Sequence, residues 1–441
     1  MQEPPAVCRR LIIPLRIIEP KNAMRAKLNV YYEAPSRNRA LTDRTASILQ
    51  SIKTVSSDEW NQCANPASEE YNPFLDHGFL RALEESGSAV AETGWQPFHL
   101  CLKEAQTTVG VVPIYLKSHS RGEYVFDAGW ADAYYRAGGE YYPKMQVSIP
   151  FTPATGRRLL VGDSPERDNI EEQLLHALVQ VAQQIKVSSL HMTFLPKTQW
   201  ERAGKFGMLQ RMDTQFHWRN NGYDNFEAFL ADLSSKKRKN IRRERREALS
   251  NDITIEWITG SDFRESHWDA FYEFYVDTSN RKWGSAYLSR SFFSLISELI
   301  PDRTLLILCK RNGRYIAGAI NFIGGKTLFG RNWGCREDHR FLHFETCYYQ
   351  AIEFAIENQL ESVEAGAQGS HKIARGYLAQ PTYSAHWVRD EGFRDAIAQF
   401  LKDERKYVEQ DIQWVESHTP FRTKLDLESF PDRLKPDQPA D

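Results

Sequence analysis

The chain of 441 residues has no apolar run long enough to cross a membrane and lacks the motifs of two common enzyme classes. No stretch approaches the roughly 20 apolar residues that a membrane-spanning helix needs. Leu11–Ile18 is short and contains Pro14 and Arg16. The patterns GxSxG and GxxxxGK(S/T) are both missing, which argues against a nucleophile-elbow serine hydrolase and a P-loop NTPase. We therefore expect no transmembrane segment and no serine nucleophile.

Cysteine is scarce and scattered. The six cysteines include no CxxC pair, so we interpret them as small buried hydrophobes in a reducing compartment, which favours a cytoplasmic location. Cys335, His339, His343 and Cys347 recur every four residues. On one helix this set would span about 18 Å, too far for a single ion with ligand bonds of about 2 Å. We predict no metal.

Net charge is also small, at −2, so the chain as a whole is not a polycation. Its 41% apolar and 12% aromatic residues suffice for two packed cores, and its length suggests two or three domains. The start is Arg-rich and interrupted by proline, and the end is polar. We predict a disordered or mis-started leader over 1–46, domains over 47–220 and 221–415, a C-terminal helix over 393–414 and a disordered tail over 416–441.

One order of predicted helices and strands occurs twice in the sequence. From Trp60, and again from Trp268, the apolar spacing predicts two helices, three strands, a helix and a further strand. The first copy comprises 72–86, 99–102, 110–116, 124–130, 174–185 and 189–195, and the second comprises 285–299, 305–309, 318–323, 328–334, 347–356 and 362–367. A repeat of about 200 residues indicates two sister domains.

This doubled order resembles the Gcn5-related N-acetyltransferase fold in its tandem form, as found in Fem-type aminoacyltransferases. Two segments carry the likeness: 234–248 (SSKKRKNIRRERREA) and 364–377 (EAGAQGSHKIARGY). More closely, the chain resembles bacterial predicted N-acyltransferases of a peptidoglycan-biosynthesis-like family, through blocks such as NPFLDHGFLRALEESG and FLHFETCYYQAIEFAI. The resemblance implies a mixed α/β (α+β) fold with two tandem acetyltransferase-like domains, each a mostly antiparallel mixed sheet flanked by helices.

The same resemblance implies transfer of an acyl or aminoacyl group to an amine by direct attack, in cell-envelope precursor metabolism. The implied co-substrate is acyl-CoA or aminoacyl-tRNA, with no tightly bound cofactor. The acceptor is a small or phosphate-bearing molecule, and tRNA is a candidate partner. The loop 336–342 (REDHRFL) lacks the glycine pattern that holds the pyrophosphate of acetyl-CoA in single-domain acetyltransferases. Two alternatives stay open: a non-catalytic RNA- or anion-binding protein that kept the fold, and a CoA-dependent acetyltransferase of small amines.

A dense run of positive charge predicts a basic helix over 234–249. Lys236–Arg246 holds eight cations and one acid, Glu244. Like charges three or four residues apart cost helix stability, and a phosphate-bearing partner would compensate them. We predict that this helix binds phosphate through Arg238, Lys239, Arg242 and Arg243. The alternative is a solvated helix balanced by acids elsewhere.

The segment 364–377 follows a predicted strand and concentrates reactive side chains. Acyl transfer to an amine needs a base, donors for the oxyanion and an acid for the leaving group. Glu364 or His371 is the candidate base, Lys372 or Arg375 the candidate for stabilising negative charge, and Tyr377 the candidate acid, while Gln368 is expected to contact substrate. The alternative is a loop with ordinary surface polarity.

Two further groups complete the predicted substrate contacts. His343 and Glu345 open a helix of the second copy, and helix N-termini attract anions; in the fold that the chain resembles, the donor lies there. In the first copy, a long loop over 131–156 is flanked by side chains suited to a phosphate or carboxylate of the acceptor. These are Asp127, Trp130, Asp132, Thr152, Thr155 and Arg157.

Overall fold

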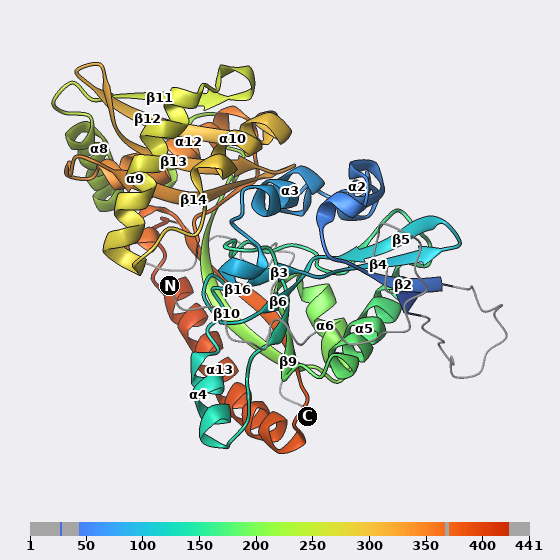
Figure 1. Cartoon of the computed structure of the whole chain (residues 1–441). Coiled ribbons are helices and arrows are strands. Elements are labelled where there is room, and N and C mark those ends of the chain that lie inside the picture. Colours follow the sequence, from blue (N-terminus) through green and yellow to red (C-terminus); the bar gives the residue numbers. More distant parts are fainter. Residues whose placement is uncertain (1–26, 29–43, 367–369, 423–441) are drawn as a thin grey trace. The chain divides into compact units, whose positions relative to one another are not determined.

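The computed structural model describes residues 27–28, 44–366 and 370–422, which form two compact units (Figure 1). The first unit comprises Met1–Gln210, Tyr287–Pro301 and Ser384–Leu401. The second comprises Arg211–Ala286, Asp302–Tyr383 and Lys402–Asp441. Within the described ranges, no helix combines the length and apolar composition that crossing a bilayer requires.

The first unit contains one small sheet and one set of central strands. The small sheet has the order β1-β2-β4-β5-β8, and the central strands have the order β9-β7-β6-β3. The strands are β1 (Lys27–Leu28), β2 (Arg44–Leu49), β3 (Trp95–Pro97), β4 (His99–Glu104), β5 (Thr107–Val112), β6 (Ile114–Lys117), β7 (Lys144–Val147), β8 (Leu160–Val161) and β9 (Ser189–Leu195). The helices are α2 (Ser57–Ala64), α3 (His77–Glu85), α4 (Ala128–Arg136), α5 (Arg167–Gln184), α6 (Lys197–Lys205) and α10 (Arg290–Leu299).

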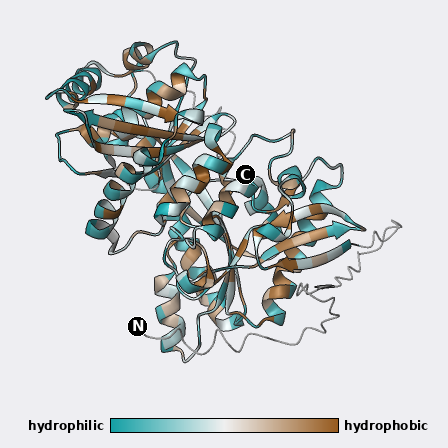
Figure 2. Cartoon of the chain, turned by 45° about the horizontal axis from the view of Figure 1, so that its top comes forward, coloured by the Kyte–Doolittle hydropathy of each residue, from teal (hydrophilic) through white to brown (hydrophobic). Residues whose placement is uncertain are grey.

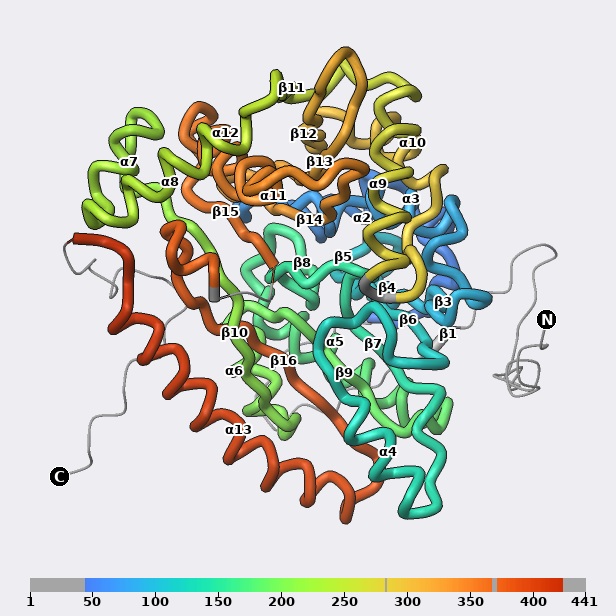
Figure 3. The backbone as a smooth tube through the Cα atoms, turned by 90° about the vertical axis from the view of Figure 1, so that its left-hand side faces the viewer, coloured from blue at the N-terminus to red at the C-terminus, as the bar shows by residue number. Residues whose placement is uncertain are grey.

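The second unit is built on strands in the order β11-β12-β13-β14-β15-β10. They are β10 (Leu209–Arg219), β11 (Thr254–Thr259), β12 (Thr304–Arg311), β13 (Arg314–Ile323), β14 (Thr327–Cys335) and β15 (Ser362–Glu364). The helices are α7 (Phe226–Asp232), α8 (Ser235–Ala248), α9 (Glu265–Trp283), α11 (Leu342–Phe344) and α12 (Gln350–Glu357). Strand β16 (Leu378–Val388) and helix α13 (Glu391–Ser417) each contribute residues to both units; α13 is continuous (Figure 3).

Both units contain the same chain connection. In the first, β6 and β7 are antiparallel, and β7 then pairs in parallel with β9, which follows α5. In the second, β13 and β14 are antiparallel, and β14 pairs in parallel with β15, which follows α12. A parallel pair requires a crossover connection, and here a helix supplies it each time. The predicted mixed, mostly antiparallel sheets are therefore present.

The apolar residues of the second unit gather between the sheet and the helices α7, α8 and α12. Its core cluster includes Trp218, Phe229, Leu305, Tyr349 and Ile352, all fully buried. Strand β12 is buried at six successive positions, as expected for a strand covered on both faces. The hydropathy colouring shows the same distribution, with largely apolar strands and polar outer helical turns (Figure 2).

Two local expectations differ from the structure. Helix α10, predicted in the second copy, belongs to the first unit because its apolar face packs on α3; the Phe79 and Phe292 rings are 5.8 Å apart. The segment 124–130, predicted as a strand, contains the start of α4, and the strand is instead Lys144–Val147. The apolar pattern did not predict that strand, because two of its four buried residues are polar, Lys144 and Gln146. The predicted basic helix over 234–249 is present as α8.

Candidate functional site

In the second unit, two parallel strands separate next to the predicted reactive segment. β14 and β15 pair at three positions, the last being Phe329 with Glu364. β15 ends at Glu364, whereas β14 continues to Cys335. A register shift at Ile320/Asn321 of β13 places an extra residue, Arg331, in β14 near this point. Bulges bend a strand away from its neighbour and are frequent beside active sites.

A cavity of about 220 Å³ lies at the far end of β14. It is lined by Trp333, Cys335 and residues 337–344. The helix that follows begins after Phe341, whose φ is 64°, and residues Glu345–Tyr349 within it are π-helical. Short π-helical stretches inside α-helices frequently mark functional sites. The predicted contact His343 therefore lies in the wall of a cavity.

Aromatic and imidazole rings connect the cavity to the segment 370–377. Phe344, in the cavity wall, lies 5.6 Å from the ring of His371. The Tyr348 hydroxyl is 3.0 Å from His371 Nε2, and the Tyr348 ring lies 5.5 Å from His343 and from Tyr377. Three predicted site residues, His343, His371 and Tyr377, thus surround Tyr348, which is not among the predicted site residues.

His371 is suited to accept a proton. Its side chain is on the exposed part of the segment. Partial burial, together with the charges of Arg375 and Lys372, lowers its pKa, so the imidazole is neutral near pH 7. Tyr377, by contrast, is fully buried, and burial raises its pKa well above the usual value. Its position does not favour the predicted return of a proton to a leaving group.

Arg375 and Lys372 hold the segment in place. Arg375 Nη2 donates to Glu244 Oε2 of α8 (2.8 Å), its Nη1 donates to the His371 carbonyl (2.7 Å), and its guanidinium lies 3.5 Å from the Phe344 ring centre. Lys372 Nζ donates to the carbonyls of Ala365 and Gly366 at 2.5 and 2.8 Å. Burial lowers the pKa of Lys372 to about 8. Both cations therefore fix the loop that carries His371.

Glu364 and Glu345 lie away from the cavity lining. Glu364 Oε1 is 3.9 Å from Nε2 of His217, whose pKa burial lowers to about 3. Glu345 is fully buried and accepts hydrogen bonds from Arg245 Nη2 (3.0 Å) and Gln350 Nε2 (2.8 Å). Burial raises the pKa of Glu345 despite the nearby Arg245. The Glu345 carboxylate thus joins α8 to the π-helical stretch.

The basic helix α8 has two different faces. Its inner face carries Ile241, Ala248, Glu244 and Arg245, the last two bonded as described. On the outer face, five cations are exposed: Lys236, Lys239, Arg242, Arg243 and Arg246. Arg242 pairs with Glu227, and Arg243 lies 3.7 Å from Glu247. Lys236, Lys239 and Arg246 have no ion pair with any residue in the described part of the chain.

In the first unit, Asp127 belongs to a buried polar network and Trp130 to an apolar cluster, so neither lies on the protein surface. Asp127 Oδ2 accepts hydrogen bonds from Lys144 Nζ and from the Tyr141 hydroxyl (2.7 Å). Burial opposes ionisation of Asp127, but Lys144 and His191 outweigh it and hold its pKa below the usual value. Trp130 packs in an apolar cluster with Tyr141 and residues of α13. Asp132 lies on the exposed side of α4.

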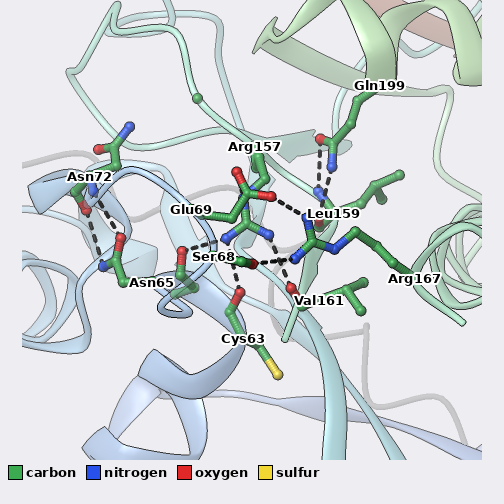
Figure 4. Close-up of polar contacts among 12 residues, drawn as sticks. Cys63, Asn65, Ser68, Glu69, Asn72, Arg157, Leu159, Val161, Arg167 and Gln199 are labelled. Atoms are coloured by element: carbon green, nitrogen blue, oxygen red, sulfur yellow. Dashed lines mark hydrogen bonds and ion pairs between the residues drawn. The ribbon is translucent and has the colours of Figure 1, made fainter. Parts of the chain in front are cut away.

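Arg157 clamps the backbone of the first unit (Figure 4). Its guanidinium donates to the carbonyls of Cys63 (3.2 Å), Ala64 (2.9 Å) and Val161 (3.1 Å). Thr152 Oγ1 donates to the Pro150 carbonyl (2.9 Å), and the Thr155 carbonyl accepts from Asn72 Nδ2 (3.4 Å). These groups bond to the protein itself, so the structure gives them a clear structural role, and substrate contact by them stays a prediction.

Comparison with known proteins identifies the relatives of this arrangement. The sequence profile of the FemAB-like family, described as peptidoglycan biosynthesis/recognition, matches residues 51–423. The chain belongs to the FemAB-like family. No curated protein sequence matches it. Among solved structures, FemX is similar with a TM-score of 0.51 and 11% identity over 78% of this chain and 98% of FemX.

Other similar structures include L-PGS from Bacillus licheniformis, with a TM-score of 0.45 and 10% identity over 76% of this chain and 98% of that chain. A tandem GNAT protein of the clavulanic acid biosynthesis pathway has a TM-score of 0.41 and 11% identity over 78% of this chain and 98% of that chain. The FemX likeness confirms the predicted fold, and the family places this FemAB-like chain among the acyl- and aminoacyltransferases.

Six of the predicted site residues of the FemAB-like chain thus fall into three groups. His343, His371 and Arg375 come together beside the cavity, whereas Glu345 and Lys372 support the surrounding structure. Gln368 lies outside the described residues. Tyr348 and the π-helical turn were missed, although the block FLHFETCYYQ, which contains them, was recognised. Among the described residues, no group of three or more His, Cys, Asp or Glu side chains is placed to hold a metal ion.

Proposed function

We propose that this FemAB-like protein transfers an aminoacyl group from aminoacyl-tRNA to the amine of a nucleotide-linked peptidoglycan precursor in the cytoplasm, with His371 as the general base. The main support for this proposal is the hydrogen bond between His371 Nε2 and the Tyr348 hydroxyl (3.0 Å). Both rings contact Phe344, which lines the cavity at the end of β14. This hydrogen bond combines an accessible neutral imidazole, His371, with a buried partner that orients it, Tyr348, and general-base catalysis requires such an arrangement.

The reaction needs one proton acceptor and no covalent enzyme intermediate. In the tautomer that carries its proton on Nε2, His371 donates to Tyr348 and keeps the Nδ1 lone pair available. The acceptor amine attacks the ester carbonyl carbon, a C–N bond forms, and the C–O bond to the terminal ribose breaks. The ammonium proton passes to His371, and the resulting imidazolium returns it to the departing ribose oxygen, which leaves as a hydroxyl.

The charges around the cavity favour an RNA-borne donor over a CoA thioester. Each basic side chain of the loop 336–340 already has an acidic partner. Arg336 pairs with Glu273, His339 with Glu337 (2.9 Å) and Arg340 with Glu247 (3.1 Å). A pyrophosphate would therefore meet compensated cations there. The outer face of α8, in contrast, offers exposed cations at helical spacing, which suits a phosphate backbone.

The test is a transfer assay with the full chain. The protein is incubated with radiolabelled bulk aminoacyl-tRNA or with acetyl-CoA, each with a UDP-linked muramoyl peptide that carries a free side-chain amine, and products are identified by mass spectrometry. We expect transfer from aminoacyl-tRNA only. His371→Asn should lower the rate by about 10²–10⁴-fold, the usual range for loss of a general base. Tyr348→Phe should lower it about tenfold, as expected for one lost hydrogen bond.

Two exposed residues provide matched controls. His418→Asn and Tyr407→Phe make the same chemical changes on the exposed surface of the chain and should leave the rate unchanged. A His371→Asn variant with the wild-type rate would contradict the proposal. Tight tRNA binding with no transfer to any acceptor would instead favour the alternative, an RNA-binding protein that retains the fold.

A further inference from the structure

The interior of the first unit contains a buried polar sheet face. Strands β6 and β7 place Tyr115 opposite Gln146, and Lys117 opposite Lys144. Alternation puts all four side chains on one face of the sheet, and all four are fully buried. His191 of β9 extends this face beside Gln146. Two buried lysines on adjacent strands are unusual, because burial without compensation disfavours the ammonium form.

The acids that compensate these lysines come from the chain that connects β6 to β7. Lys144 Nζ donates to Glu123 Oε2 (2.7 Å), to Ser120 Oγ (2.8 Å) and to Asp127. Lys117 Nζ is 3.8 Å from Glu123 Oε1 and lies 3.6 Å from the Trp95 ring centre. The lysines are thus on the rigid strands, whereas Glu123 is on a segment without helix or strand.

Glu123 fits its site less well than Asp127 does. Glu123 accepts one hydrogen bond, from Lys144, whereas Asp127 accepts two, from Lys144 and Tyr141. Each carboxylate keeps one buried oxygen, Glu123 Oε1 and Asp127 Oδ1, without a hydrogen-bond partner within the described residues. Burial, only partly offset by Lys144, raises the pKa of Glu123 to about 7, and burial lowers the pKa of Lys117 to about 6. Buried polar groups are normally satisfied. Glu123 Oε1, at 3.8 Å, lies beyond hydrogen-bond distance of Lys117 Nζ and compensates it incompletely, so an oxyanion placed closer to Lys117 would favour its ammonium form.

The two acids also differ in how firmly they are held. Asp127 directly precedes α4, which is anchored by Trp130 in the apolar cluster with Tyr141, Ile397 and Leu401. Glu123 lies between Gly122 (φ 81°) and Tyr124 (φ 60°), two residues in the left-handed region. That region is unfavourable for a side chain as large as tyrosine. Release of 118–126 would relieve this strain and leave Asp127 in place.

We propose that Lys117 and Lys144 form an oxyanion-binding site of the first unit, in which the Glu123 carboxylate is an internal occupant that a carboxylate- or phosphate-bearing ligand displaces. The site is distinct from the cavity beside His371, and it does not depend on the reaction proposed above. The ligand oxygens take the places of Glu123 Oε1 and Oε2 between the two ammonium groups, and the segment 118–126 moves to solvent.

Calorimetric titration of the full chain with inorganic phosphate, and separately with acetate, tests the site. Glu123→Gln keeps the shape but removes the charge of the occupant, so it should tighten binding about tenfold, the value of one charged hydrogen bond. The gain should disappear in Glu123→Gln/Lys117→Met. Glu140→Gln, an exposed acid on the same connection, is the matched control and should bind as wild type does. Binding of phosphate alone would identify the ligand as phosphate-bearing, and binding of acetate alone would identify it as carboxylate-bearing.

Hydrogen exchange gives an independent readout that does not require Glu123→Gln to fold. In the wild-type protein, saturating phosphate or acetate should increase the exchange rate of the amides in 118–126, and Lys117→Met should abolish that increase. The proposal is overturned if exchange in this segment slows or stays constant, or if the affinity gain of Glu123→Gln persists without Lys117.

Discussion

The buried pair of Arg245 and Glu345 allows a sharp test of how the basic helix is attached. The Glu345 side chain is fully buried, whereas that of Arg245 is 20% exposed. Arg245→Met removes the cation and leaves a buried carboxylate with Gln350 as its remaining donor. Removing one partner of a buried ion pair costs about 3–5 kcal/mol of unfolding free energy. We expect a loss in that range for the second unit.

The pH dependence of this loss has a definite sign. Burial already raises the pKa of Glu345 above its unfolded value, and loss of Arg245 raises it further. A group whose pKa is higher in the folded state contributes most below its unfolded pKa and loses that contribution as pH rises through the folded pKa. The destabilisation by Arg245→Met should therefore be small near pH 5 and large at pH 8.

Urea unfolding followed by circular dichroism at these two pH values measures the effect. The double variant Arg245→Met/Glu345→Gln removes both charges and should recover most of the loss, because no unpaired buried charge remains. Arg243→Met, on the exposed side of the same helix, is the control and should cost less than about 1 kcal/mol. A loss below about 1 kcal/mol for Arg245→Met, or no recovery in the double variant, would refute the reasoning.

Three further outcomes follow from the structure. Neutralising Lys236, Lys239 and Arg246 to Gln should weaken tRNA binding and reduce the slope of log K against log salt, by about 0.7–0.9 for each phosphate that the helix no longer neutralises; an unchanged slope in filter binding would exclude α8 as the tRNA-binding element. Because the pKa of Lys372 is lowered to about 8 in the fold, stability should rise with pH between about 8 and 10.5, and Lys372→Met should remove that rise in pH-dependent urea unfolding. Arg157→Met should lower the unfolding free energy of the first unit by several kcal/mol, because three backbone carbonyls lose their donor at about 1–3 kcal/mol each. A loss below about 1 kcal/mol in the unfolding transition of the first unit would show that these hydrogen bonds are dispensable.

The element order was largely predictable because it depends on local periodicity. Apolar spacing correctly located α5, β9, β12 and α12, where residues of one kind recur at 3.6 or 2 positions. The failures occur where long-range interactions override that signal. Lys144–Val147 is a strand although half of it is polar, since its lysine is paired with acids from the preceding loop. Helix α10 is amphipathic as predicted, but only packing on α3 decides which unit it joins.

In the candidate site, too, the local sequence predicted some features and long-range contacts decided the others. The concentration of His371, Lys372 and Arg375 in one segment was visible from composition. Their separate tasks were not, because each depends on a partner outside residues 371–375: Tyr348 for His371, the Ala365 carbonyl for Lys372 and Glu244 for Arg375. The charge density of α8 was likewise evident, but not that Arg245 faces the interior while Lys239 faces solvent.

By itself, the sequence determined that this protein has two related α/β halves, a basic helix and a polar segment after the last strand of the repeat. Those properties follow from the order and spacing of residues along the chain. Only the tertiary structure decided which charges are neutralised by the protein and which remain for a ligand. Burial and ion pairing depend on distances between residues far apart in the chain, such as Glu244 and Arg375, which are 131 positions apart, and no local pattern encodes them.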